Sequence, residues 1–148
     1  MNQPKSDKTT QRYLLFRLGD QTYGTPIMKV REVTEYKEPK PIPNSMPGFT
    51  GVINLRGEVL GVIDLRALLN IAPMTCLSFL VFETKNSLLA AMVDRVLAVV
   101  EIPDNDIELN TGKGAGAHEY YMGVAKMSSG LVTLINLQGI SGGLETEA

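Results

Sequence analysis

The sequence has very few of the residue types that build covalent or metal-stabilised sites. It contains one cysteine, Cys76, one histidine, His118, and no tryptophan. A single cysteine cannot form an internal disulfide bond, which is typical of proteins in a reducing compartment, and a zinc site needs more Cys and His ligands than these two. Asp104, Asp106 and Glu108 alternate along the chain, without the glycine and the terminal bidentate glutamate of a calcium loop. We therefore expect no metal site.

The polar residues that remain do not form a catalytic constellation. His118 lies in a glycine-rich segment, residues 112–119, where no nucleophile is placed beside it. Cys76 lies in an apolar run and lacks a basic neighbour that would favour its thiolate. The glycines near His118 have neither the P-loop spacing nor the dinucleotide-binding spacing. The sequence predicts no enzymatic activity and no cofactor.

Long apolar runs and an excess of positive charge are also missing. No apolar stretch approaches the ~20 residues of a membrane-spanning helix, and residues 1–11 lack the apolar segment of a secretory leader. The formal net charge is −2 and the basic residues are scattered singly, whereas a nucleic-acid-binding face needs clustered basic residues. We expect a cytoplasmic protein that neither inserts into a membrane nor binds nucleic acid.

What the sequence does contain is a series of short segments rich in Val, Ile and Leu, separated by turn residues. Gly19-Asp20, Gly57 and Ser128-Ser129-Gly130 each lie between two such segments and predict β-hairpins. Residues 37–43 are rich in proline and cannot be helical, whereas residues 65–70 have room for one or two helical turns. Many short strands with regular turns indicate a mainly β protein.

The chain also contains an internal repeat. Residues 51–55 align with residues 123–127, and 62–65 align with 134–137, both at an offset of 72 positions. Earlier strands align at an offset of 66, for example Phe16 with Phe82. Insertions are tolerated best in loops, and the difference between the two offsets falls in the glycine-rich segment. The sequence therefore predicts two copies of one five-stranded unit.

The two copies differ most at one hairpin tip. The first copy has Asn54-Leu55-Arg56-Gly57-Glu58, where the second has Lys126-Met127-Ser128-Ser129-Gly130. Gly57 permits a positive φ beside Arg56, and a guanidinium at the tip can bind a carboxylate through paired hydrogen bonds. Glu35 is the candidate internal partner. The alternative is a surface arginine without a specific role.

A second candidate for recognition is the proline-stiffened segment from Ile42 to Phe49. A stiff loop loses little entropy on binding, so its apolar side chains suit a protein interface. The alternative is a lid over one end of the first unit. Met28, Val30 and Val33 include core and surface positions that the sequence alone does not separate.

Two runs stand out: Gly51-Val52-Ile53-Asn54-Leu55-Arg56-Gly57 and Val62-Ile63-Asp64-Leu65-Arg66. Together they resemble the CheW-like domain of bacterial chemotaxis. Weaker matches are Tyr13 to Gly19, Val30 to Val33, Pro41 to Pro43, Leu88 to Val93 with Asp94 and Val96, and Met122 to Val124. The similarity extends over residues 12–140, which is nearly the whole chain.

The resemblance implies a mainly β fold of two five-stranded SH3-like β-barrel subdomains with one or two short helices. Residues 1–11 and 142–148 would be tails around a single domain, residues 12–141. The first barrel would span about residues 12–70 and the second about 76–141. Strands could exchange between the barrels at the C-terminus.

The resemblance further implies a non-catalytic adaptor that couples the cytoplasmic tips of methyl-accepting receptors to a CheA-type histidine kinase. No cofactor is implied, and the protein would be recruited from the cytoplasm to membrane-associated receptor arrays. The protein-binding residues would be Val30, Val33, Glu35, Ile42, Gly51, Asn54, Arg56, Gly57 and Glu58. Two alternatives stay open: a small-ligand sensor with a pocket between the barrels, and a diverged CheW-like scaffold in a twitching or biofilm pathway.

Overall fold

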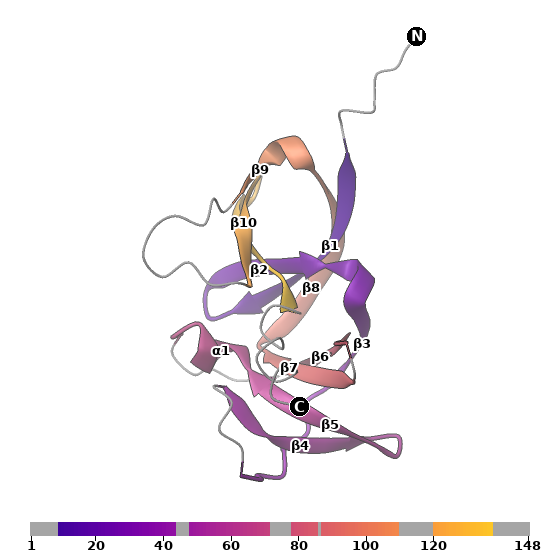
Figure 1. Ribbon diagram of the computed structural model, residues 1–148. Coiled ribbons are helices and arrows are strands. Elements are labelled where there is room, and N and C mark those ends of the chain that lie inside the picture. Colours follow the sequence, from indigo (N-terminus) through magenta and orange to yellow (C-terminus); the bar gives the residue numbers. More distant parts are fainter. Residues whose placement is uncertain (1–8, 44–47, 72–77, 86, 110–119, 138–148) are drawn as a thin grey trace.

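The computed structural model describes residues 9–43, 48–71, 78–85, 87–109 and 120–137 of the chain (Figure 1). The first half contains β1 (Thr10–Leu18), β2 (Gln21–Pro26), a 3-10 turn (Ile27–Lys29), β3 (Val30–Glu35), β4 (Phe49–Leu55), β5 (Glu58–Asp64) and α1 (Leu65–Leu68). The second half contains β6 (Ser78–Glu83), β7 (Leu88–Val93), β8 (Arg95–Pro103), a 3-10 turn (Asp104–Asp106), β9 (Ile107–Leu109), β10 (Tyr121–Met127) and β11 (Gly130–Ile135). The expectation of a mainly β protein with a short helix after residue 65 is confirmed.

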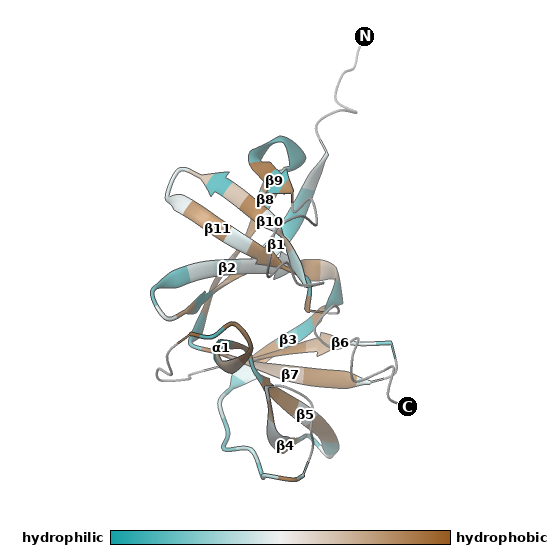
Figure 2. Ribbon diagram, turned by 60° about the vertical axis from the view of Figure 1, so that its left-hand side comes forward, coloured by the Kyte–Doolittle hydropathy of each residue, from teal (hydrophilic) through white to brown (hydrophobic). Residues whose placement is uncertain are grey.

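The strands form two sheets. A six-stranded sheet has the order β8-β1-β2-β11-β10-β9, and a five-stranded sheet has the order β3-β6-β7-β5-β4. Figures 1 and 2 show the two sheets one above the other, with α1 beside the five-stranded sheet. The expectation of two β units is thus confirmed at the level of sheets. Within the described residues, no ladder of backbone pairing joins the two edge strands of either sheet.

The assignment of strands to the two units differs from the sequence-based expectation. The hairpin β1–β2 belongs to the first half of the chain, yet β1 pairs with β8 and β2 pairs with β11. The hairpin β6–β7 belongs to the second half, yet it pairs with β3 and β5. The expected units over residues 12–70 and 76–141 therefore do not correspond to the two sheets. The first hairpin of each half is incorporated into the sheet that contains most strands of the other half. The exchange involves these hairpins, whereas the C-terminal strands β10 and β11 stay paired with each other.

The internal repeat is confirmed down to individual strand pairs. Phe49 pairs with Ile63 and Gly51 with Val62, with a bulge between the two pairs. The equivalent pairs in the second copy lie 72 positions later and carry a bulge at the same place, between Tyr121 and Gly123. Register is set by the hydrophobic pattern and the turns, so two copies with one pattern adopt one register.

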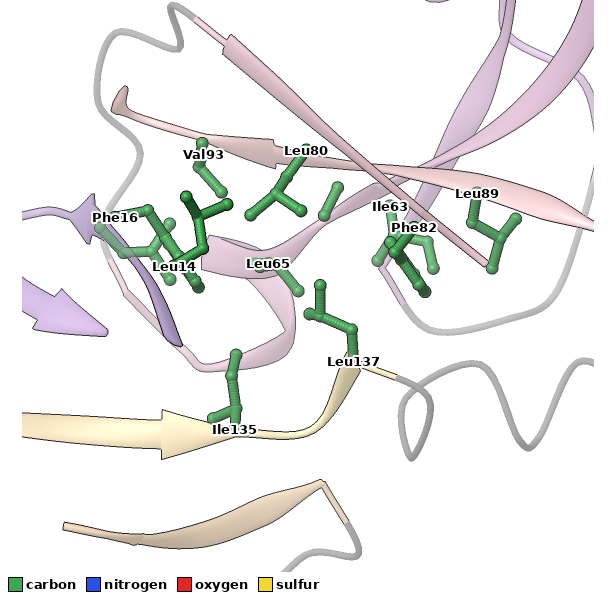
Figure 3. Packing of buried hydrophobic residues seen from close by; sticks show 12 residues of the cluster. Leu14, Phe16, Ile63, Leu65, Leu80, Phe82, Leu89, Val93, Ile135 and Leu137 are labelled. Atoms are coloured by element: carbon green, nitrogen blue, oxygen red, sulfur yellow. The ribbon is translucent and has the colours of Figure 1, made fainter. Parts of the chain in front are cut away.

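Alternation along the strands divides the apolar residues among three cores. A shared core lies between the two sheets (Figure 3) and contains Leu14, Phe16, Leu18, Ile63, Leu65, Leu80, Phe82, Leu89, Ala91, Val93, Ile135 and Leu137. The other face of the five-stranded sheet covers Ile53, Leu55, Leu60, Val62, Phe79, Val81, Ala90 and Met92. The other face of the six-stranded sheet covers Tyr13, Leu15, Ile102, Ala125, Val132 and Leu134. Successive side chains of a strand point to opposite faces, so each central strand serves two cores.

Candidate protein-binding site at the Arg56 hairpin

Arg56 lies in a two-residue turn between β4 and β5. Arg56 has a φ of 51° and Gly57 a φ of 89°, and positive φ at both central residues is the pattern of a type I′ hairpin turn. The side-chain Oδ1 of Asn54 accepts a hydrogen bond of 2.9 Å from the backbone N–H of Gly57. The expectation of a positive φ at Gly57 is confirmed, and the arginine itself shares this conformation at a cost of about 1 kcal/mol.

The equivalent turn of the second copy has another backbone. Met127 pairs with Gly130 across Ser128 and Ser129, and neither serine has a positive φ, whereas Gly130 has a φ of 130°. Both turns close the same kind of hairpin on the same kind of sheet. The fold therefore does not require the unusual conformation of Arg56.

The guanidinium of Arg56 binds Glu32, which lies in β3. Its Nη2 donates to Oε1 at 2.8 Å and to Oε2 at 2.7 Å. The contact links the β4–β5 turn at one end of the five-stranded sheet to β3 at the other end. The side chain of Arg56 is 70% exposed and that of Glu32 is 28% exposed, so the pair is presented at the surface with the arginine outermost.

The expectation that Glu35 pairs with Arg56 is wrong, and the cause is a bulge. The pairing of β3 with β6 shifts between Val30 and Glu32. After the shift, Glu32 is half-buried on one face of the strand, whereas Val33 and Glu35 are exposed. The repeat carried a signal for this bulge, because the two valines that recur in the second copy, Val30 and Val33, are separated by an odd number of positions.

Two further contacts hold the chain between β3 and β4 beside the hairpin. The Nζ of Lys37 donates to the backbone oxygen of Asn54 at 2.7 Å. Lys40 and Val52 form an isolated bridge with backbone hydrogen bonds of 2.8 and 2.9 Å. Sequence reasoning did not single out Glu32 or Lys37, because neither belongs to the motif around Arg56.

A second ion pair lies on β3 next to Glu32. Arg31 Nη2 is 2.8 Å from Glu83 Oε2, and the two side chains are 55% and 41% exposed. Arg31 occupies the bulge, and Glu83 is the last residue of β6. This pair joins two neighbouring strands, β3 and β6, whereas the Arg56–Glu32 pair joins the two ends of the five-stranded sheet.

A close backbone contact explains why residue 51 is a glycine. Gly51 is buried with a φ of 152°, and a Cβ built on it would contact the carbonyl oxygen of Lys40. Gly123 repeats this arrangement, with a φ of 157° and the carbonyl oxygen of Glu108 in the same place. In both cases a neighbouring backbone segment lies too close for any larger residue, so packing alone accounts for both glycines.

The other expected site residues lie at different depths. Val30 is half-buried against the shared core. Val33 is 44% exposed and Ile42 is 42% exposed, and Glu58 is exposed at the start of β5. The structure thus gathers Asn54, Gly57 and Glu58 around Arg56, in one hairpin. Residues 44–47 of the proline-stiffened segment lie outside the described residues.

Other kinds of site find little support in the described part of the chain. No group of three or more His, Cys, Asp or Glu side chains among those residues is arranged to hold a metal ion. Within those residues, no helix combines the length and the apolar character needed to span a membrane. Cys76 and His118, the two residues considered for nucleophilic or acid–base chemistry, lie outside the described ranges.

Comparisons with known proteins agree with this fold over nearly the full length. The model of the CheW-like domain matches residues 12–144. Chemotaxis protein CheW of Rhizobium meliloti (strain 1021) is 29% identical over 139 residues, which cover 91% of this chain and 90% of that protein. Protein FrzA of Myxococcus xanthus is 35% identical over 141 residues, which cover 92% of this chain and 86% of that protein.

A solved structure shows the same architecture. The crystal structure of the scaffolding protein TtCheW from Thermoanaerobacter tengcongensis matches with a TM-score of 0.78 and 26% sequence identity. The match covers 89% of this chain and 92% of that one. The similarity therefore includes both sheets and not only the motif around Arg56.

Proposed function

The chain belongs to the CheW-like domain family, and on this premise we propose that it is a non-catalytic adaptor that couples methyl-accepting chemoreceptors to a CheA-type histidine kinase. Its work is to hold two other proteins in a fixed geometry. The relatives named chemotaxis protein CheW and the scaffolding protein TtCheW support this role. The proposal includes recruitment of the protein from the cytoplasm to receptor arrays at the membrane.

The observation that carries the proposal is the Arg56–Glu32 pair. The two sheets are built from equivalent strands of the repeat, yet among the described residues only the five-stranded sheet carries such an exposed pair on a turn with an unfavourable arginine φ. A backbone outlier that the fold does not require is typical of a functional position. The pair is therefore proposed as the centre of a docking surface, with Asn54 and Glu58 of the same hairpin beside it.

The guanidinium has donors left for a partner. Among the described residues, the carboxylate of Glu32 is the only hydrogen-bond partner of the Arg56 side chain, and one terminal nitrogen makes both contacts. An arginine held in this way keeps its remaining donors in a fixed plane, which suits a carboxylate or backbone carbonyls of another protein. Glu32 orients the side chain, and the partner would complete its hydrogen bonds.

The test is direct binding to a CheA-type kinase and to cytoplasmic receptor fragments, measured by calorimetry. We expect Arg56→Glu to weaken binding at the docking surface. Ala substitution of both Arg31 and Glu83 is the control, because it removes another exposed ion pair of the same sheet. The absence of binding to either protein at micromolar concentration would refute the proposal. Identity to FrzA is as high as to proteins named CheW, so more than one receptor–kinase set should be tested.

A further inference from the structure

A buried charged cluster lies where the chain passes from one sheet to the other. Arg66, in α1, is only 5% exposed, and Asp94, between β7 and β8, is 8% exposed. Arg66 Nη1 donates to Asp94 Oδ1 at 3.4 Å, and Arg66 Nε donates to Asp64 Oδ1 at 3.2 Å. Asp64 also caps α1, because its Oδ1 accepts the backbone N–H of Arg66 at 3.0 Å.

Asp94 connects this cluster to the six-stranded sheet. Its Oδ2 accepts a hydrogen bond of 2.6 Å from the backbone N–H of Gly19, in the β1–β2 turn. Its own backbone N–H donates to the carbonyl oxygen of Arg17 at 3.0 Å. Asp64 is the last residue of β5 and Arg66 follows it in α1, so both are attached to the five-stranded sheet. One carboxylate thus binds groups from both sheets at the point where the chain crosses between them.

The repeat supplies an internal comparison for this crossing. The chain makes an earlier crossing between the sheets, from β2 to β3, and the residue equivalent to Asp94 at an offset of 66 positions is Met28. Met28 is 85% exposed, and no side-chain hydrogen bond caps the 3-10 turn that contains it. The first crossing is therefore open at the surface, whereas the second is held by buried charges. The fold does not need a charge in order to make the crossing.

We propose that Arg66 and Asp94 are positioning residues that fix the angle between the two sheets. The shared core attracts the sheets to each other, but apolar burial is not directional. Hydrogen bonds between charged groups are directional and are satisfied in one arrangement only. A buried ion pair contributes little to stability compared with apolar residues of similar size. Its role here is therefore to select one orientation of the two sheets. Neither side chain is exposed enough to contact a partner.

Pulsed electron paramagnetic resonance between spin labels tests the proposal. Labels at Val59 and Leu131 report on the inter-sheet distance, since these residues lie on different sheets and are 65% and 68% exposed. Labels at Gln21 and Leu109 report within the six-stranded sheet alone, and Cys76→Ser removes the native thiol.

The main variant is Arg66→Met with Asp94→Asn. Both charges of the pair are removed together, so that neither residue remains as a buried charge without its partner. We expect the distribution of inter-sheet distances, which should be a single narrow peak in the wild type, to broaden in this variant. The thermal midpoint and the distance within the six-stranded sheet should stay unchanged. The matched control is Arg31→Met with Glu83→Gln, which removes an exposed ion pair inside one sheet and should leave both distances unchanged.

A distribution of inter-sheet distances in the main variant that is as narrow as in the wild type would overturn the proposal. Should the main variant fail to fold, Asp94→Glu keeps the charge and lengthens the side chain by one methylene. We then expect a shifted inter-sheet distance, and an unshifted one would overturn the proposal equally.

The consequence for signalling rests on the proposed function. If kinase and receptor bind different parts of the protein, a loose angle should reduce control of the kinase in assembled arrays while each partner alone still binds with wild-type affinity. The distance measurement uses the protein without partners. Its result therefore stands even where no kinase or receptor binds, and failure of the two proposals is distinguishable.

Discussion

Asn54 Oδ1 lies 2.9 Å from the backbone nitrogen of Gly57 and closes the turn that presents Arg56. The carbonyl oxygen of the same residue accepts the hydrogen bond of Lys37. Asn54 thus fixes both the backbone of the turn and the chain that runs beside it.

Asn54→Ala should lower the free energy of unfolding by about 1 kcal/mol, because the turn loses a side-chain hydrogen bond to a backbone N–H. It should also weaken partner binding, since Arg56 is no longer held by a fixed turn. Asn54→Asp is the matched control, because a carboxylate oxygen can still accept the hydrogen bond of Gly57. Urea denaturation and calorimetry measure the two effects, and equal behaviour of both variants would contradict the role given to Oδ1.

Arg56→Asn should separate binding from stability. Asparagine adopts positive φ more readily than arginine, which should recover part of the about 1 kcal/mol cost of that conformation. Loss of an exposed ion pair costs about 0–1 kcal/mol, so the two effects nearly cancel in the free energy of unfolding. Binding to the kinase or receptor should nevertheless fall. A clearly reduced denaturation midpoint would show that Arg56 is needed for the fold.

Gly51→Ala and Gly123→Ala should both destabilise the protein strongly, because the new Cβ of each would meet a backbone carbonyl oxygen that cannot move independently. Gly57→Ala is the comparison, since a Cβ there would meet nothing within 4 Å and only the positive φ opposes it. We expect about 1 kcal/mol for Gly57→Ala and a clearly larger loss for the other two. Thermal denaturation of the three variants in parallel tests this order.

Alkaline pH should lower the stability of the folded protein. Burial raises the pKa of Tyr13 above its usual 10.0, and the nearby charge of Asp104 raises it further. Burial also raises the pKa of Tyr23 and of Tyr120. A pKa that is higher in the folded state means a stabilising contribution that is complete below pH 10.0 and is lost as the pH rises through the folded value. Tyr13→Phe should reduce the loss of stability above pH 10.0 in urea titrations, and an unchanged pH slope would argue against burial as the cause.

The sequence predicted the repeated unit well because register depends on local pattern. Positions that are apolar in both copies, such as Phe16 and Phe82, are buried at equivalent places in the shared core. The hairpin at Gly57 was also predictable, since glycine between two apolar runs has a direct conformational meaning. These features are determined by residues close together in the chain.

The sequence did not predict which strands pair across the repeat. The hairpins β1–β2 and β6–β7 carry the same pattern, so either could complete either sheet, and pattern alone does not choose between them. The partner of Arg56 was missed for a related reason. A bulge at Arg31 changes which residues of β3 share a face, and the choice between Glu32 and Glu35 depends on that bulge.

The exchanged hairpins make the two halves of the polypeptide mutually dependent. Cutting the chain in the connection after α1 would leave each fragment with a hairpin whose neighbours are on the other fragment. Neither piece could then saturate its backbone hydrogen bonds alone, whereas the two pieces mixed could restore the whole. A destabilising mutation in either half consequently affects both sheets.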